Sequence, residues 1–193
     1  MKNIVLFASG GGSNAGQIMQ YFESSENYRV AALFTNNPNA GAIGLADKFG
    51  VPSVLFNRVQ LEGGEVLAKL RSFNPALVVL AGFLWKMPSE IVAAFPDKIV
   101  NIHPALLPKY GGKGMYGINV HRAVLENKET ESGITIHYVN EHYDEGNIIA
   151  QHRVALDDCS TPEDIARKVL AVEHEYYARV IEEILDRFEN EAI

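Results

Sequence analysis

The sequence predicts an α/β fold: an open, mostly parallel sheet with helices on both faces and an antiparallel strand pair near the C-terminal half. Short apolar, β-branched runs alternate with helix-like segments of about 10–15 residues. These runs are apolar throughout, which is typical of parallel strands covered on both faces. After residue 102 the alternation changes, and two strand-like runs follow each other across a tight connection. The 193 residues contain no internal repeat or linker, so we expect a single domain over residues 1–193.

The chain up to residue 102 alternates expected strands and helices. The strands are Asn3–Phe7, Arg29–Phe34, Ser53–Phe56, Ala76–Leu80 and Ile99–Ile102. The helices between them are about Asn14–Phe22, Gly41–Phe49, Leu61–Arg71 and Pro88–Phe95.

The rest of the chain has a different order of expected elements. Pro104 to Gly117 is rich in glycine, proline and lysine, and a short helix is expected near Val120–Glu126. Gly133–Val139 and Asn147–Val154 are expected strands joined by seven residues, which predicts an antiparallel hairpin. A last helix is expected from the N-cap Thr161, followed by a proline, to Phe188.

Composition excludes several classes of protein. With 17 basic and 24 acidic side chains the formal net charge is −7, which excludes a mainly electrostatic nucleic-acid binder. No apolar run approaches the roughly 18–20 residues of a membrane helix, and the N-terminus lacks the apolar stretch of a signal peptide. The one cysteine, Cys159, forbids an intrachain disulfide and agrees with a reducing compartment. We therefore expect a soluble, cytoplasmic protein without nucleic-acid or membrane partners.

Ligands of open α/β sheets bind beyond the carboxyl ends of the strands, so the loops there are the candidate functional segments. The first is Ser9-Gly10-Gly11-Gly12-Ser13-Asn14. Glycines let backbone N–H groups approach an anion, and the following helix N-terminus adds partial positive charge, which predicts a phosphate cradle. The loop matches a dinucleotide pattern, but Thr35-Asn36-Asn37 stands where that pattern needs an acidic residue. A monophosphate is favoured over NAD or ATP; a flexible turn is the alternative.

Two later loops carry polar side chains. Asn101 and His103 are two residues apart at the end of a strand, so they project to the same face. An amide donor beside an imidazole can stabilise an oxyanion, and the histidine can also move protons near neutral pH. A capping asparagine with a buried structural histidine is the alternative. Asp144, in the expected hairpin connection, suits a turn when it is considered by itself.

Four segments together resemble the formyltransferases that use 10-formyltetrahydrofolate. They are Gly11-Gly12-Ser13-Asn14, Leu80-Ala81-Gly82-Phe83, Asn101-Ile102-His103-Pro104 with Leu107-Pro108-Lys109-Tyr110, and the stretch from His137 through Asp144 to Gly146. The likeness covers essentially the whole chain, and Asn-x-His-Pro with a distant Asp is highly specific. It implies a Rossmann-like formyltransferase fold and an enzyme of purine biosynthesis. Such an enzyme transfers the formyl group of 10-formyltetrahydrofolate to the amino group of glycinamide ribonucleotide.

The resemblance also implies roles for single residues. Asn101 and His103 stabilise the oxyanion formed when the amine attacks the formyl carbon directly, while Asp144 supports His103 and relays a proton through water. The implied contacts to the ribonucleotide and its phosphate are Gly11, Gly12, Ser13, Asn14 and Glu173. The implied contacts to the folate are Arg58, Phe83, Leu84, Trp85, Lys86, Met87, Asn101 and Tyr143. A solvated helix face is the alternative for Glu173, and core or interface packing is the alternative for Trp85.

Several expectations concern what accompanies the site. No closed set of metal ligands is visible in the sequence, so we expect catalysis without a metal, in a monomer or homodimer. Residues 111–119 depart from the common family pattern, and their glycines suit a closing lid. The RNA-binding domain of methionyl-tRNA formyltransferases and the regulatory domain of formyltetrahydrofolate hydrolases are not expected. An NADPH-dependent oxidoreductase and a nucleotide sensor without turnover are the competing functions.

Overall fold

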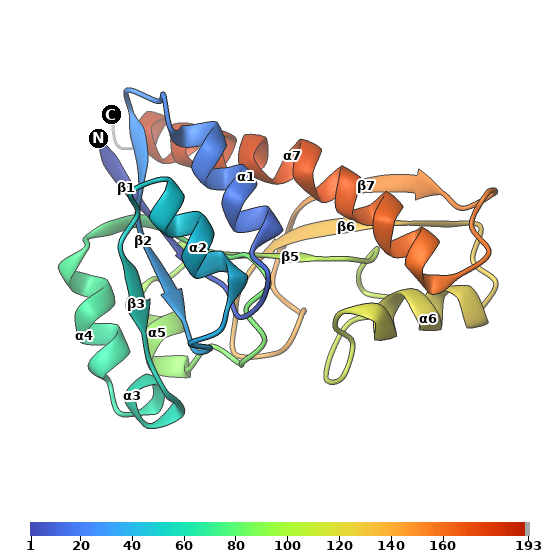
Figure 1. Ribbon diagram of the computed structural model, residues 1–193, viewed down its shortest axis with the longest axis horizontal. Helices are drawn as coiled ribbons and strands as arrows, with labels where there is room; N and C mark the ends of the chain where they lie inside the picture. Colours follow the sequence, from blue (N-terminus) through green and yellow to red (C-terminus); the bar gives the residue numbers. More distant parts are fainter. Residues whose placement is uncertain (192–193) are drawn as a thin grey trace.

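The computed structural model describes residues 1–191 and contains one seven-stranded sheet in the order β3-β2-β1-β4-β5-β6-β7 (Figure 1). The strands are β1 (Lys2–Phe7), β2 (Tyr28–Thr35), β3 (Ser53–Leu55), β4 (Pro75–Leu80), β5 (Ile99–His103), β6 (Glu131–Tyr138) and β7 (Ile148–Ala155). Strands β1 to β5 are parallel, and β6 runs antiparallel to both β5 and β7. The predicted fold class and the predicted hairpin are confirmed.

Helices cover both faces of the sheet. The helices α1 (Ser13–Phe22), α2 (Gly41–Lys48), α6 (Ile118–Glu126) and α7 (Pro162–Asn190) contribute to one core, and α3 (Arg58–Glu62), α4 (Glu65–Ser72) and α5 (Ser89–Ala94) to the other. The central strand β1 divides its side chains between them: Ile4 and Leu6 face the first core, Val5 and Phe7 the second, and all four are fully buried. This burial on both faces explains why the strand is apolar throughout.

One predicted helix is wrong. The segment expected as a single helix from Leu61 to Arg71 forms two short helices, because Gly64 has a φ of 85° and the chain turns there. A capping box at Asn57, whose side chain accepts from the Gln60 N–H, starts the first helix earlier than expected, at Arg58. The other expected helices are observed with ends shifted by at most two residues.

The long helix α7 begins where the sequence predicted. The Thr161 side chain accepts from the Asp164 N–H, and the Asp164 side chain accepts from the Thr161 N–H, with a proline in the first turn. The helix lies alongside α1 and α6 and contributes nine buried residues (Figure 1). Among residues 1–191, no helix has both the length and the apolar composition needed to cross a membrane.

The strand order places a switch point at the centre of the sheet. From β1 the chain adds β2 and β3 on one side, and β4 and β5 on the other side. The loops that follow β1 and β4 therefore leave the sheet next to each other, in the position where open α/β sheets bind ligands. We call residues 9–14, after β1, the phosphate loop, and residues 82–87, after β4, the folate loop, after the ligands that the sequence leads us to expect there.

Candidate active site

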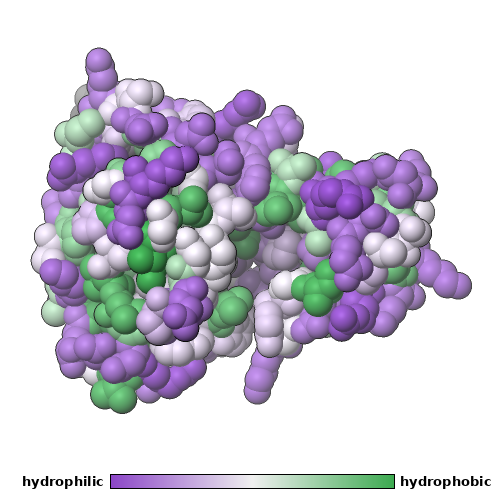
Figure 2. Space-filling view, viewed as in Figure 1, coloured by the Kyte–Doolittle hydropathy of each residue, from purple (hydrophilic) through white to green (hydrophobic). Residues whose placement is uncertain are grey.

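A cavity of about 330 Å³ opens at the carboxyl ends of β1, β4 and β5. Figure 2 shows a hollow there, between the larger part of the molecule and the smaller part that carries α6. Eleven of the residues singled out from the sequence line the cavity: Asn14, Phe83, Leu84, Trp85, Lys86, Met87, Asn101, His103, Tyr143, Asp144 and Glu173. The fold thus brings together side chains that are up to 159 positions apart in the sequence.

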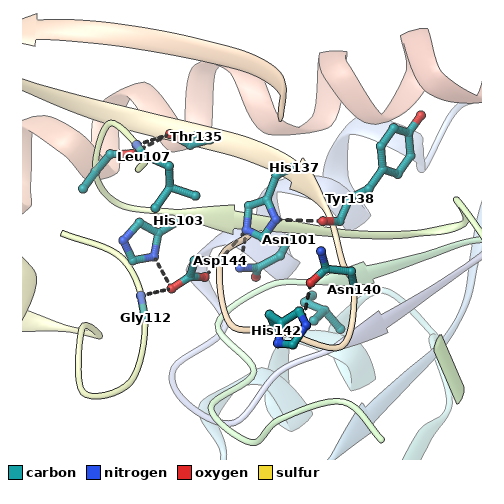
Figure 3. A network of polar contacts seen from close by, with 12 residues as sticks. Asn101, His103, Leu107, Gly112, Thr135, His137, Tyr138, Asn140, His142 and Asp144 are labelled. Carbon is teal, nitrogen blue, oxygen red and sulfur yellow. Dashed lines mark hydrogen bonds and ion pairs between the residues drawn. The ribbon is translucent and has the colours of Figure 1, made fainter. Parts of the chain in front are cut away.

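Asn101 and His103 enter the cavity region from β5, and β6 supports them. Asn101 pairs with His137 across the antiparallel ladder, and the Asn101 Nδ2 lies 3.2 Å from the His137 Nε2 (Figure 3). The other ring nitrogen of His137, Nδ1, lies 2.9 Å from the Tyr138 carbonyl oxygen. Because a carbonyl can only accept, Nδ1 carries the proton, Nε2 accepts, and the Asn101 amide is oriented with its nitrogen toward His137.

Burial favours this neutral form of His137. The side chain is almost fully buried, and desolvation lowers its pKa, with the charge of His103 acting in the same direction. The hydrogen bond to Tyr138 and the charge of Asp144 oppose this shift. A neutral His137 leaves one amide hydrogen of Asn101 free to point at a bound molecule.

His103 is buried at 3% exposure and has two unequal nitrogens. Its Nε2 donates to the Tyr110 carbonyl oxygen at 2.7 Å, whereas its Nδ1 lies 3.6 Å from the Asp144 Oδ2. The second distance is longer than a hydrogen bond. Nδ1 is therefore the nitrogen that can exchange a proton or donate to a reacting oxygen.

Asp144 sits between the two histidines. Its Oδ2 accepts from the Gly112 N–H at 2.9 Å, and its Oδ1 lies 3.7 Å from the His137 Nε2 (Figure 3). Asp144 has a φ of 56°, a left-handed conformation that aspartate and asparagine adopt more readily than most residues. The turn character predicted for Asp144 is thus present, and the same residue also contacts the site.

The phosphate loop presents an uncapped helix N-terminus. Gly12 is the N-cap of α1 with a φ of 75°; within the described part of the chain this N-cap has no side-chain cap, and the first turn of α1 contains no acidic residue. A Cβ on Gly12 would lie 2.5 Å from the Ala42 Cβ, so this glycine is needed for packing against α2. Gly11 has open space around its Cβ position. The free N–H groups and the helix dipole make this end of α1 a site for an anion.

Asn14 and Glu173 connect α1 to α7 at the edge of the cavity. The Asn14 Nδ2 donates to the Glu173 Oε2 at 2.6 Å, and the Asn14 Oδ1 is buried with no hydrogen-bond partner among residues 1–191. Glu173 is 8% exposed, so the solvated helix face considered for it is wrong. Burial raises the pKa of Glu173, and the hydrogen bond from Asn14 partly offsets that rise.

The folate loop forms an apolar wall of the cavity. Phe83 packs edge-on against Phe7, Met87 is buried in the core, and Leu84 is 57% exposed. Trp85 contacts Phe56 on its inner side and the Arg58 guanidinium, 4.5 Å from its ring. Lys86 lies over the Tyr143 ring at 5.8 Å. Trp85 therefore belongs partly to the core and partly to the cavity.

Some predicted contacts lie outside the cavity, and some lining residues are not among the predicted contacts, although residues 112–117 belong to the segment expected as a lid. Gly11, Gly12, Ser13 and Arg58 do not line it, although the first three adjoin Asn14 and Arg58 adjoins Trp85. Residues 112–117 and His137 line it. His137 lies opposite Asn101 across the antiparallel pair of β5 and β6, and its signal in the sequence was its place at the start of the stretch that resembles the family. Among residues 1–191, no group of three or more His, Cys, Asp or Glu side chains is arranged to hold a metal ion.

Fold and site define an α/β protein with an amide, an imidazole and a carboxylate at one cavity. The model of the protein family described as "Formyl transferase" matches residues 2–181. The chain belongs to this family. The resemblance seen in the sequence is confirmed.

The names of similar proteins agree with this family. The chain is 44% identical over 187 residues to phosphoribosylglycinamide formyltransferase, chloroplastic, of Arabidopsis thaliana, covering 93% of this chain and 64% of that protein. It is 35% identical to phosphoribosylglycinamide formyltransferase of Bacillus subtilis, covering 96% of this chain and 95% of that protein. The chain thus spans less than two thirds of the plant relative. A crystal structure of phosphoribosylglycinamide formyltransferase from Bacillus halodurans is similar, with a TM-score of 0.88, 31% identity and 98% of each chain covered.

Proposed function

We propose that this chain, as a single domain over residues 1–193, transfers the formyl group of 10-formyltetrahydrofolate to the amino group of glycinamide ribonucleotide in purine biosynthesis. The observation that carries the proposal is the convergence of Asn101, His103 and Asp144 on one cavity in a member of the formyl transferase family. The names of the relatives from Arabidopsis thaliana and Bacillus subtilis support this choice of substrate.

The reaction we propose is a direct attack by the amine. The amino nitrogen forms a bond to the formyl carbon, the carbonyl oxygen becomes an oxyanion, and the bond from that carbon to the folate nitrogen then breaks. The free amide hydrogen of Asn101 and the Nδ1 of His103 are the donors for the oxyanion. The proton lost by the attacking amine passes to the leaving folate nitrogen, with the Asp144 carboxylate, 3.6 Å from His103, as relay through water.

In this proposal the two substrates bind to different segments around the cavity. The phosphate of the ribonucleotide binds the uncapped N-terminus of α1, at Gly11, Gly12, Ser13 and Asn14. The Glu173 carboxylate, which faces the cavity beside Asn14, accepts hydrogen bonds from ribose hydroxyls. The folate packs against Phe83, Leu84, Trp85, Met87 and Tyr143, with Lys86 and Arg58 toward its carboxylates.

A spectrophotometric assay tests the function. Purified protein is mixed with glycinamide ribonucleotide and either 10-formyltetrahydrofolate or 10-formyl-5,8-dideazafolate, and loss of the formyl group is followed by absorbance. We expect turnover that requires both substrates, and strongly reduced turnover in Asp144→Asn. Binding of the ribonucleotide without turnover would indicate a sensor, and a rise of the melting temperature with NADPH would indicate an oxidoreductase.

Location and partners belong to the same proposal. We propose a cytoplasmic protein whose partners are its two small-molecule substrates, because the net charge of −7 disfavours nucleic acid and the one cysteine suits a reducing compartment. The name of the relative from Arabidopsis thaliana places that protein in the chloroplast.

A further inference from the structure

We propose that Ser9, the first residue of the phosphate loop, is a positioning residue for the folate loop. This role rests on the proposed function in one respect: the proposed function assigns the phosphate loop to the ribonucleotide and the folate loop to the folate. Ser9 is 6% exposed and does not line the cavity, so it acts through the backbone of the folate loop.

Two hydrogen bonds join Ser9 to the folate loop. The Ser9 backbone N–H donates to the Gly82 carbonyl oxygen at 3.0 Å, and the Leu84 backbone N–H donates to the Ser9 Oγ at 3.0 Å. These bonds exist because β1 and β4 are neighbours in the sheet, so the loops that follow them leave side by side. The Ser9 side chain thus holds the backbone at the exposed tip of the folate loop, next to Trp85.

The direction of the Ser9 hydroxyl is set by a third loop. The Ser9 Oγ donates its hydrogen to the Asn36 Oδ1 at 2.7 Å, which leaves an oxygen lone pair for the Leu84 N–H. The Asn37 Nδ2 donates to the Ser9 carbonyl oxygen at 3.0 Å. Asn36 and Asn37 occupy the place where a dinucleotide site has its acidic residue, and here their amides hold Ser9.

The folate loop has few other polar restraints. Of residues 83–87, Leu84 alone has a hydrogen bond to another part of residues 1–191, and Leu84 itself is 57% exposed. Phe83 and Trp85 are held by contacts of their rings with Phe7 and Phe56. Such contacts are less directional than hydrogen bonds and fix the backbone less strictly. Loss of the Ser9 hydroxyl should therefore loosen this wall of the folate site and leave the α1 N-terminus unchanged.

Ser9→Ala should change the kinetics of the substrate that its own loop does not bind. Ser9→Ala lies in the phosphate loop, yet it should raise KM for the folate by about threefold to tenfold. This is the change in an equilibrium constant that the loss of one hydrogen bond typically causes. The ribonucleotide KM and the kcat of the folded fraction should stay near their wild-type values. Ser13→Ala, in the same loop and without a bond to the folate loop, is the matched variant and should act on the ribonucleotide KM instead.

A second measurement does not depend on activity. Trp85 is the one tryptophan of the chain, so intrinsic fluorescence and its quenching by acrylamide report on the folate loop directly. We expect more quenching in Ser9→Ala, a smaller increase in Asn36→Ala, no further increase in the double variant, and no change in Ser53→Ala on the exposed edge strand β3.

The two measurements separate the possible failures. Unchanged quenching and an unchanged folate KM in Ser9→Ala, or a lower melting temperature as the only effect, would overturn the positioning role. Inactivity of the wild-type protein with both substrates would instead overturn the proposed function, and the quenching series would still decide the role of Ser9. If Ser9→Ala does not fold, Asn36→Ala decides the question, because it removes the acceptor that orients the hydroxyl.

Discussion

Asp144→Asn removes one negative charge from the candidate active site and changes little else. Asparagine also adopts the left-handed conformation that Asp144 has at a φ of 56°. Its side-chain oxygen can still accept from the Gly112 N–H, the 2.9 Å bond that holds the loop over the site. Asp144→Ala would lose that bond and strain the backbone, so the asparagine variant is the better probe of the charge.

The size of the effect follows from two distances. The Asp144 oxygens lie 3.6 Å from the His103 Nδ1 and 3.7 Å from the His137 Nε2, and only His103 is expected to carry the proton during the reaction. At an effective dielectric constant of about 20, two unit charges at such a separation interact by about 5 kcal/mol. Since each factor of ten in rate corresponds to about 1.4 kcal/mol, the full interaction amounts to about 10³-fold. Solvent at the 12% exposed carboxylate weakens it, and we expect a loss in kcat of roughly 10²–10³-fold.

The assay is formyl transfer with both substrates saturating, together with a thermal melt of each variant. Asp144→Asn, His103→Ala and the double variant should be similarly slow, because either single change disables the same unit. The melting temperature of Asp144→Asn should stay within a few degrees of wild type. A kcat within threefold of wild type, or losses that multiply in the double variant, would refute the role of the Asp144 charge.

Four further predictions follow from the same geometry. Gly11→Ala, which has open space for its Cβ, should raise KM for the ribonucleotide by at least about tenfold and leave the folate KM unchanged; an unchanged ribonucleotide KM would remove the phosphate assignment. Glu173→Gln should raise the same KM more than it lowers kcat, and kinetics that match wild type would exclude a ribose contact. Activity should survive exhaustive dialysis against EDTA, and a loss restored by zinc would overturn catalysis without a metal. Burial lowers the pKa of His121 from its ordinary value of 6.5, so the unfolded state takes up this proton first and stability should fall as the pH drops below 6.5. Denaturant unfolding from pH 7 to pH 5 should show a smaller fall in His121→Gln, and identical slopes would contradict the assignment.

Local patterns predicted most of the fold. Continuous apolar runs such as Ile4 to Phe7 indicated strands buried on both faces, because such residues stabilise only a doubly covered sheet. Thr161 followed by a proline marked the start of α7, because capping depends on neighbouring residues alone. The sequence does not indicate the break at Gly64, because apolar residues on both sides suit a helix and a single left-handed residue interrupts it.

Local patterns could also select Asn101 and His103, which share one strand. Their partners could not be selected in this way. Asp144 by itself has the character of a turn residue, and only the family resemblance linked it to the site. Its place between His103 and His137 depends on the pairing of β5 with β6, which brings residues about 40 positions apart within 4 Å.

The sequence by itself determined the class of fold, the order of its elements, the family and the residue types of the site, because these depend on periodicity, capping and short motifs. Tertiary structure alone decided which nitrogen of His103 is free, that His137 orients Asn101, that Glu173 is buried against Asn14, and that Ser9 joins the loops that follow β1 and β4. The physical reason is that hydrogen bonds between loops depend on which strands are neighbours and on the direction of each donor. Neither property is encoded in the local pattern of any one segment.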